Sequence, residues 1–89
     1  MTAEGELRVR RDAAVWREID GETVVLDVAS GSYLGLNATG SQLWGALVEG
    51  ASRADLVSLL VQHFAVTPEE AGRDVDQFLD TCRARGLVE

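Results

Sequence analysis

Apolar and polar residues alternate over the first half of the chain, and this period of two predicts β-strands. Three short runs carry the alternation, at residues 13–19, 23–28 and 32–36. In the middle run Val24, Leu26 and Val28 occupy every second position, so we expect these residues to face a core. Asp20-Gly21 separates the first two runs, and such a pair is typical of a tight hairpin turn. The first half therefore predicts a three-stranded antiparallel β-meander within about residues 13–36.

The second half carries apolar residues at helical spacing, with capping signals before the helices. Ser52 followed by Asp55, and Thr67-Pro68 followed by Glu70, fit the capping box that starts a helix. The short interval between these two helices predicts a helix-turn-helix pair. The last helix is expected to bury Ala71, Val75, Phe78, Leu79 and Cys82.

The start of the first helix leaves two N-caps open. Thr39 and Gln42 fit a capping box, and Asn37 is a rival cap two residues earlier. Gly50 and Gly86 are expected to end the first and third helices in the left-handed conformation. Together these signals predict three helices within about residues 38–86.

Strands followed by a helix-turn-helix predict an α+β fold of the winged helix-turn-helix type, a three-stranded antiparallel β-meander followed by three helices. A chain of 89 residues can bury one modest core. We therefore expect a single domain at residues 7–89. Residues 1–6 are small and acidic and are predicted to be a flexible N-terminal tail.

Acidic residues outnumber basic ones by fifteen to eight, no Lys is present, and the formal net charge is −7. A winged helix can bind DNA, but the would-be recognition helix carries Glu69, Glu70 and Asp74 near its N-terminus, where they would face phosphates. Nucleic acid is therefore not the expected partner. An acidic winged-helix transcriptional regulator remains the alternative of another class.

The sequence predicts a cytoplasmic protein with no membrane partner. No apolar run approaches the ~20 residues of a membrane span, and residues 1–12 lack the apolar core of a signal peptide. Cys82 is the single cysteine, so it cannot form an internal disulfide, which agrees with a reducing compartment.

Few residues in the sequence are suited to catalysis. A nucleophilic pair of Cys82 with His63, the single histidine, would also need an orienting group and an oxyanion site. Cys82 instead falls on the apolar stripe of the last helix, as a small buried hydrophobic residue does. Asp74, Asp76 and Asp80 have no His or Cys beside them to complete a transition-metal site. We expect no enzyme, no cofactor and no metal.

The third predicted strand, residues 32–36, leaves one edge of the sheet unpaired. It carries no Lys or Pro to block that edge, and Gly35 removes a side chain where another backbone could approach. Leu34 and Leu36 share one face of the strand, and Tyr33 lies on the other. A peptide added to this edge would lie in a groove between the third strand and the third helix. The alternative is that the protein's own termini cover the edge.

Residues 24–52, VVLDVASGSYLGLNATGSQLWGALVEGAS, resemble the PqqD-like family of peptide-recognition proteins. The shared features are a strand that ends in a Leu-Asn-x-x-Gly turn, a helix with Trp and Leu, and a Gly before the second helix. They fall on Leu36, Asn37, Gly40, Trp44, Leu47 and Gly50. The resemblance continues more weakly through Asp74, Val75, Phe78 and Leu79 to Gly86-Leu87.

The resemblance implies a RiPP recognition element, a domain without catalysis of its own that binds the leader segment of a ribosomally synthesised precursor peptide. The leader would add as a strand beside the third strand and against the third helix. The pattern LDxxxGxYxxLNxxG is most similar to the lasso-peptide versions. Their partners are a leader-removing cysteine protease and an ATP-dependent macrocyclase. The rival within the family is a PQQ-type precursor chaperone for a radical enzyme.

By position, the resemblance also implies a set of peptide-binding residues on the third strand and the third helix. They are Val28, Ser32, Tyr33, Leu34, Gly35, Leu36, Asp74, Val75, Phe78, Leu79 and Cys82. The apolar members would receive Tyr, Pro and Leu side chains of the leader, and the acidic third helix would meet its basic residues.

Overall fold

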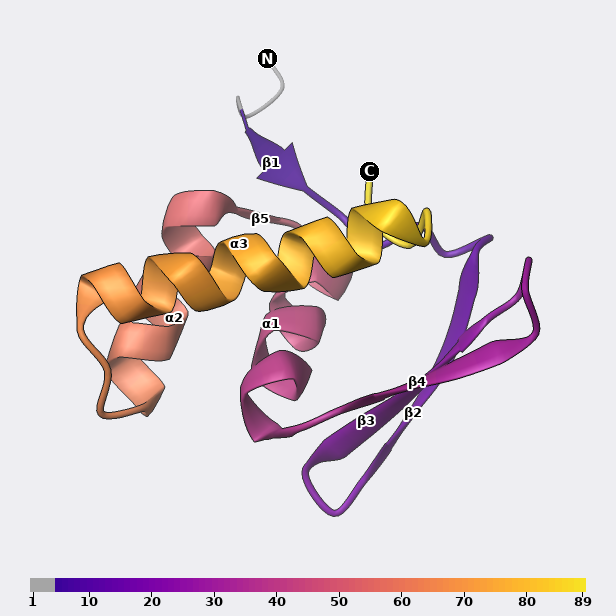
Figure 1. Ribbon diagram of the computed structural model, residues 1–89, viewed down its shortest axis with the longest axis horizontal. Helices are drawn as coiled ribbons and strands as arrows, with labels where there is room; N and C mark the ends of the chain where they lie inside the picture. The colour runs from indigo at the N-terminus through magenta and orange to yellow at the C-terminus, as the bar shows by residue number, and fades with distance from the viewer. Residues whose placement is uncertain (1–4) are drawn as a thin grey trace.

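Three helices and two small sheets make up residues 5–89, the part of the chain that the computed structural model describes (Figure 1). The strands are β1 (Glu6–Leu7), β2 (Ala14–Ile19), β3 (Glu22–Asp27), β4 (Ser32–Leu36) and β5 (Ala51–Ser52). The helices are α1 (Ala38–Glu49), α2 (Arg53–His63) and α3 (Pro68–Ala84). β2, β3 and β4 form an antiparallel sheet in chain order, and β1 pairs with β5. The predicted α+β fold, a three-stranded meander followed by helices, is confirmed.

Strand β3 presents the opposite face to the core from the one predicted. Its odd-numbered residues are buried, Val25 completely, whereas Val24 and Leu26 are half-buried on the other face and Val28 is exposed in the following turn. Val25 lies opposite Leu34 of β4, so the two point to the same side of the sheet. Because the run Val-Val-Leu places apolar residues on both faces, alternation alone does not fix which face is inner. The prediction for β3 was wrong by one residue.

Helix α1 covers the inner face of the sheet and supplies the centre of the core. Trp44 and Leu47 are almost completely buried. The indole of Trp44 meets that of Trp16 of β2 edge to face, with ring centroids 5.5 Å apart and planes at 76°, an arrangement that aromatic pairs favour. On β4, Leu36 is buried toward this core while Tyr33 is 70% exposed on the outer face, as the alternation in that strand predicted.

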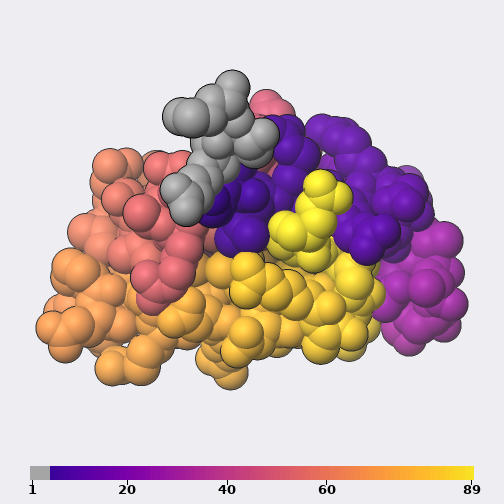
Figure 2. Space-filling view, turned by 90° about the horizontal axis from the view of Figure 1, so that it is seen from above, coloured from indigo at the N-terminus to yellow at the C-terminus, as the bar shows by residue number. Residues whose placement is uncertain are grey.

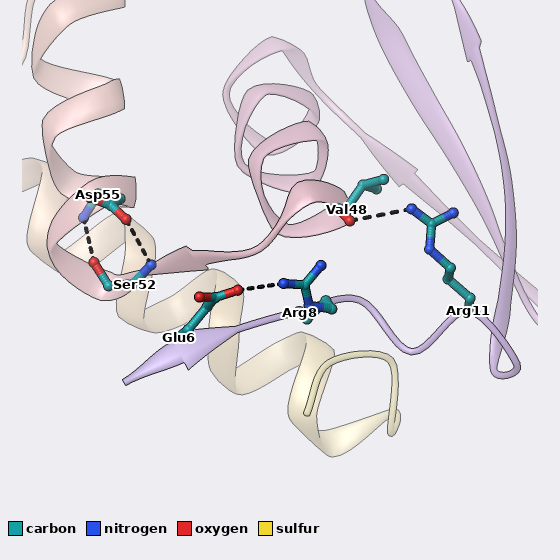
Figure 3. A network of polar contacts seen from close by, with 6 residues as sticks. All are labelled: Glu6, Arg8, Arg11, Val48, Ser52 and Asp55. Carbon is teal, nitrogen blue, oxygen red and sulfur yellow. Dashed lines mark hydrogen bonds and ion pairs between the residues drawn. The ribbon is translucent and has the colours of Figure 1, made fainter. Parts of the chain in front are cut away.

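Helices α2 and α3 start at the predicted capping boxes. The N–H of Asp55 donates to the Ser52 hydroxyl and the N–H of Ser52 donates to the Asp55 carboxylate, both over 3.1 Å (Figure 3). Thr67 and Glu70 make the same reciprocal pair. The hydrogen bonds from Thr67 hold the pKa of the Glu70 carboxyl below its usual value. Two of the orphan N–H groups at each helix start are thereby satisfied.

Helix α3 is fixed to α2 rather than to the sheet. Its buried residues are Ala71, Gly72, Val75, Leu79 and Cys82, and Phe78 is half-buried. At the start of α2, the Arg53 guanidinium donates to both carboxylate oxygens of Asp76 on α3, over 2.7 and 3.0 Å. This pairing raises the pKa of Arg53 and lowers that of Asp76. The predicted helix-turn-helix pair is therefore present, with an apolar seam and an ion pair across it.

The segment before β2 and the C-terminal residues lie side by side on one face of the molecule (Figure 2). In β1, Glu6 is opposite Ser52, and further along Val9 forms a β-bridge with Val88. Residues 1–4 of the predicted tail lie outside the described residues, and at Glu6 the tail prediction was wrong because that residue is paired. The described ends of the chain pair here, so they do not cover the outer edge of β4.

Asn37, and not Thr39, caps helix α1. The Asn37 side-chain oxygen accepts the N–H of Gly40 over 2.9 Å, and its carbonyl accepts the N–H of Ser41 over 2.8 Å. Thr39 therefore lies inside the first turn, where its hydroxyl cannot act as N-cap. Of the two alternatives that the sequence left open, the structure selects Asn37.

Replacing the cap should therefore destabilise the protein more than replacing Thr39. We expect Asn37→Ala to lower the free energy of unfolding by about 1 kcal/mol, because it orphans the Gly40 N–H. The matched change Thr39→Ala removes a hydroxyl two residues away without loss of a cap and should cost only a few tenths of that amount. Urea unfolding followed by circular dichroism measures both. Equal losses would contradict the assignment of the cap.

Candidate peptide-binding site

Strand β4 has a free outer edge, and the sheet register shows which main-chain groups point from it. The N–H of Val28 donates to the carbonyl of Ala13 over 3.0 Å, so the even-numbered residues of β3 bond to β2. The odd-numbered residues of β3 then bond to the even-numbered residues of β4. The N–H and C=O groups of Tyr33 and Gly35 consequently point away from the sheet. No strand of the described residues pairs with them.

A groove of about 530 Å³ runs along this edge, between β4, the start of α1 and α3. In Figure 1, β4 lies below α3 and leads directly into α1. The lining residues are Leu34, Gly35, Leu36, Asn37, Thr39, Gly40, Leu43, Asp74, Gln77, Phe78 and Thr81. An extended peptide paired to the β4 edge would therefore place every second side chain in this groove.

The groove has an apolar floor and a polar rim. Leu36 and Leu43 are buried beneath it, and Leu34 and Phe78 are half-buried at its walls. On α3, three exposed polar side chains border the opening, those of Asp74, Gln77 and Thr81. Such a surface can bury apolar peptide side chains and can pair a basic peptide residue with the Asp74 carboxylate.

Five of the residues expected to bind a peptide line the groove. They are Leu34, Gly35, Leu36, Asp74 and Phe78. Val75, Leu79 and Cys82 do not, because each is at most 2% exposed within the core. The core-facing stripe of α3 and the groove-facing one are neighbours: the groove takes residues 74, 77, 78 and 81, an i, i+3, i+4, i+7 face rotated by one residue from 75, 79 and 82. We therefore remove the three buried residues from the expected contacts.

Val28, Ser32 and Tyr33 also lie outside the groove lining. Val28 is in the turn before β4, Ser32 is the exposed first residue of the strand, and the Tyr33 side chain is on the outer face. Of these three residues, Tyr33 alone can take part in pairing at the edge, through its main-chain N–H and C=O groups. Sequence reasoning assigned no peptide contact to the remaining lining residues, Asn37, Thr39, Gly40, Leu43, Gln77 and Thr81. The four helical positions 74, 77, 78 and 81 share one face, a signal that could have identified Gln77 and Thr81.

Asp27 and Gly31 of the LDxxxGxY pattern have structural roles in the turn before β4. The buried carboxylate of Asp27 accepts the N–H of Ser30 over 3.4 Å, and the Asp27 carbonyl accepts the N–H of Gly31 over 2.8 Å. Gly31 has a φ of 73°, which favours glycine. These residues set where β4 begins and are not part of the groove.

Within residues 5–89, no group of three or more His, Cys, Asp or Glu side chains is arranged to hold a metal ion. His63 ends α2 and Cys82 is in the core, on a different helix. None of the helices described is both long and apolar enough to cross a membrane. The feature of the described residues suited to binding is the β4 edge with its groove.

The outer edge of β4 lies beside a groove with an apolar floor and a polar rim, on a winged helix-turn-helix scaffold, and this is the kind of surface to which an extended peptide can add as a strand. Residues 22–88 match the family model described as "Coenzyme PQQ synthesis protein D (PqqD)". The chain therefore belongs to the PqqD family, as the sequence predicted. No curated protein sequence matches significantly.

Two solved structures resemble the whole chain. One is described as "TbiB1 in Complex with the TbiA(beta) Leader Peptide"; it is 33% identical with a TM-score of 0.84, and the match covers 92% of this chain and 94% of that one. The other is "Lasso peptide synthetase B1 complexed with the leader peptide", 28% identical with a TM-score of 0.80, covering 93% of this chain and 96% of that one. Both resemble this chain over nearly their full length.

The position of Cys82 in the core leads to a prediction about its reactivity. Burial raises the pKa of its thiol to about 11, so little thiolate forms at pH 8. We expect Ellman's reagent to react at least about tenfold more slowly with the native protein than with the urea-unfolded chain, whose thiol has a pKa of about 8.5.

The same raised pKa favours the folded state while the thiol is protonated. The thiol's contribution to the free energy of unfolding should therefore decrease as the pH rises through the interval between the unfolded pKa of about 8.5 and the folded pKa of about 11. The Cys82→Ala variant, which has no thiol, provides the control for this interval. In the reactivity experiment, native protein that reacts with Ellman's reagent as fast as unfolded protein would show that the Cys82 thiol is accessible.

Proposed function

We propose that this protein is a RiPP recognition element that binds the leader segment of a ribosomally synthesised precursor peptide, most specifically a lasso-peptide precursor. The leader adds as a strand to the edge of β4 and places alternate side chains in the groove beside α3. The observation that carries the proposal is the edge of β4, unpaired within the described residues, beside a groove with an apolar floor and a polar rim. Two similar proteins whose structures contain leader peptides support it.

The size of the site agrees with useful affinity. The main-chain groups of Tyr33 and Gly35 can make up to one hydrogen bond each, at about 1 kcal/mol net. One or two large apolar side chains in the groove add about 2–3 kcal/mol each. These gains approach the ~8 kcal/mol of micromolar binding before ordering costs are subtracted. We expect affinities from sub-micromolar to micromolar.

Charge favours a peptide over nucleic acid. The net charge is −7, and the exposed start of α3 carries Glu69, Glu70 and Asp74. Carboxylates there repel phosphates and attract basic leader residues. The transcriptional regulator is therefore the weaker candidate. A PQQ-type precursor chaperone acting with a radical enzyme remains the second candidate, supported by the family model that the chain matches.

We further propose that the protein performs no chemistry itself and presents the leader in the cytoplasm to a cysteine protease, and then to an ATP-dependent macrocyclase. The outer face of the sheet supports a protein partner, because Val15, Ile19 and Tyr33 are 60%, 51% and 70% exposed there. Tyr33 belongs to β4 itself, so this apolar face adjoins the proposed leader site. The protease is the occupant that we assign to it, since it must reach the bound leader to cut it.

A charge placed in the groove should abolish leader binding. Leu34→Asp and Phe78→Asp each leave an unpaired carboxylate among apolar groups once a leader covers the site. We expect each to weaken the affinity for the leader of the precursor encoded beside this chain's gene by at least about tenfold. Fluorescence anisotropy with the labelled leader measures this. Val61→Asp adds the same charge at an exposed apolar position on α2 and should bind normally. Normal binding by both groove variants, with both folded, would show that the leader binds elsewhere.

A charge on the outer face of the β2–β3–β4 sheet should slow leader removal by the protease without weakening leader binding. We expect Ile19→Asp to leave leader affinity within about twofold of wild type, since Ile19 does not line the groove. Leader removal by the partner protease should slow by at least about fivefold, because a charge would be buried at the interface. A chromatographic cleavage assay measures the rate. Unchanged cleavage would rule out this face as the protease contact.

A further inference from the structure

Gly40 lines the groove at a position where an added Cβ would fit only tightly. It is a buried residue in the first turn of α1. A Cβ placed on it would lie 3.3 Å from the Leu36 Cβ, 3.4 Å from the Phe78 Cε1 and 3.5 Å from the Asn37 Oδ1. The first of these contacts is tighter than most Cβ contacts, and the other two are ordinary van der Waals distances. Gly40 has no positive φ, so backbone conformation does not require glycine here. A side chain at this position is disfavoured instead by its close approach to Leu36.

Of the three neighbours, the ring of Phe78 is the one free to move. Leu36 is 7% exposed and fixed in β4, and the Asn37 oxygen is held by its cap bond to the Gly40 N–H. Phe78 is half-buried, and its ring borders the open groove. A methyl group at position 40 would occupy part of the groove floor, in contact with the edge of this ring.

We propose that Gly40 is a specificity-determining residue of the leader site: its missing side chain leaves the depth in which one large apolar leader side chain is buried. This inference rests on the proposed leader binding. With no side chain at position 40, the Phe78 ring lies close to the first turn of α1, and the buried Leu36 and Leu43 line the groove beside it.

Helix α1 contains a matched control for this proposal. Gly45 lies in the same helix, also without a positive φ, but it is exposed and a Cβ built there meets no atom within 4 Å. It does not line the leader groove. Gly45→Ala therefore makes the same chemical change in the same helix while leaving the groove unaltered.

The probe is the fluorescein-labelled synthetic leader of the precursor encoded beside this chain's gene, together with its single-alanine variants. We expect Gly40→Ala to melt within about 5 °C of wild type, since helix propensity and crowding oppose each other. It should bind the leader at least about fivefold more weakly, whereas Gly45→Ala binds as wild type does.

The alanine variants of the leader test specificity directly. With the wild-type protein, replacing one large apolar leader residue by alanine should reduce the affinity more than any other replacement. With Gly40→Ala, this reduction in affinity should be at least about threefold smaller, because the groove no longer accommodates the side chain. The double variant Gly40→Ala/Phe78→Leu lacks the crowded ring carbon and should recover the affinity of Phe78→Leu alone.

The outcomes distinguish this inference from the proposed function. A wild-type protein that does not bind the leader overturns both. A wild-type protein that binds while Gly40→Ala binds equally well overturns the role of Gly40 and leaves leader binding intact. A uniform loss across all leader variants, or a large fall in melting temperature, would assign Gly40 to folding and reject a role in specificity.

Discussion

Main-chain polar groups in a protein need hydrogen-bond partners, and within residues 5–89 strand β4 is paired along one side only. The position of α3 leaves the outer edge of β4 open. The helix is held by its apolar seam against α2 and by the Arg53–Asp76 pair, not by contacts that close it onto the sheet. A helix docked on β4 would fill the groove and leave no room for a second chain. The site therefore depends on an anchor placed at the far side of α3.

The sequence predicted the order and type of the main elements because local signals determine them. Asp-Gly marks a hairpin, and reciprocal caps at Ser52 and Thr67 start two helices wherever the chain lies in space. The inward face of β3 was not predictable in the same way. Apolar residues occur on both of its faces, and the choice is made by pairing with β4 and packing against α1. The sequence signals also fitted both Asn37 and Thr39 as the cap, and the hydrogen bond from the Gly40 N–H to Asn37 decides between them.

The sequence predicted which strand and helix flank the groove, but it did not predict all of the side chains that line it. The third strand and third helix were both correctly expected to flank a groove. The most apolar stripe of α3 was taken as the binding face, yet strongly apolar residues such as Val75 and Leu79 are those that the core buries first. The exposed face one residue away is mixed, with Phe78 among polar neighbours. Gly40 contributes by the absence of a side chain, a property that spacing alone does not reveal.

The pairing of the chain ends has a consequence for protein architecture. The segment that follows β1 pairs with the C-terminal residues through Val9 and Val88. In Figure 1, β1 and the C-terminus lie above α3, whereas β4 lies below it. A second domain joined through a linker at either end would emerge on the side remote from the groove. Genetic fusion to an enzyme is thus compatible with an open docking channel, and the same module can serve as a separate subunit or as part of a longer polypeptide.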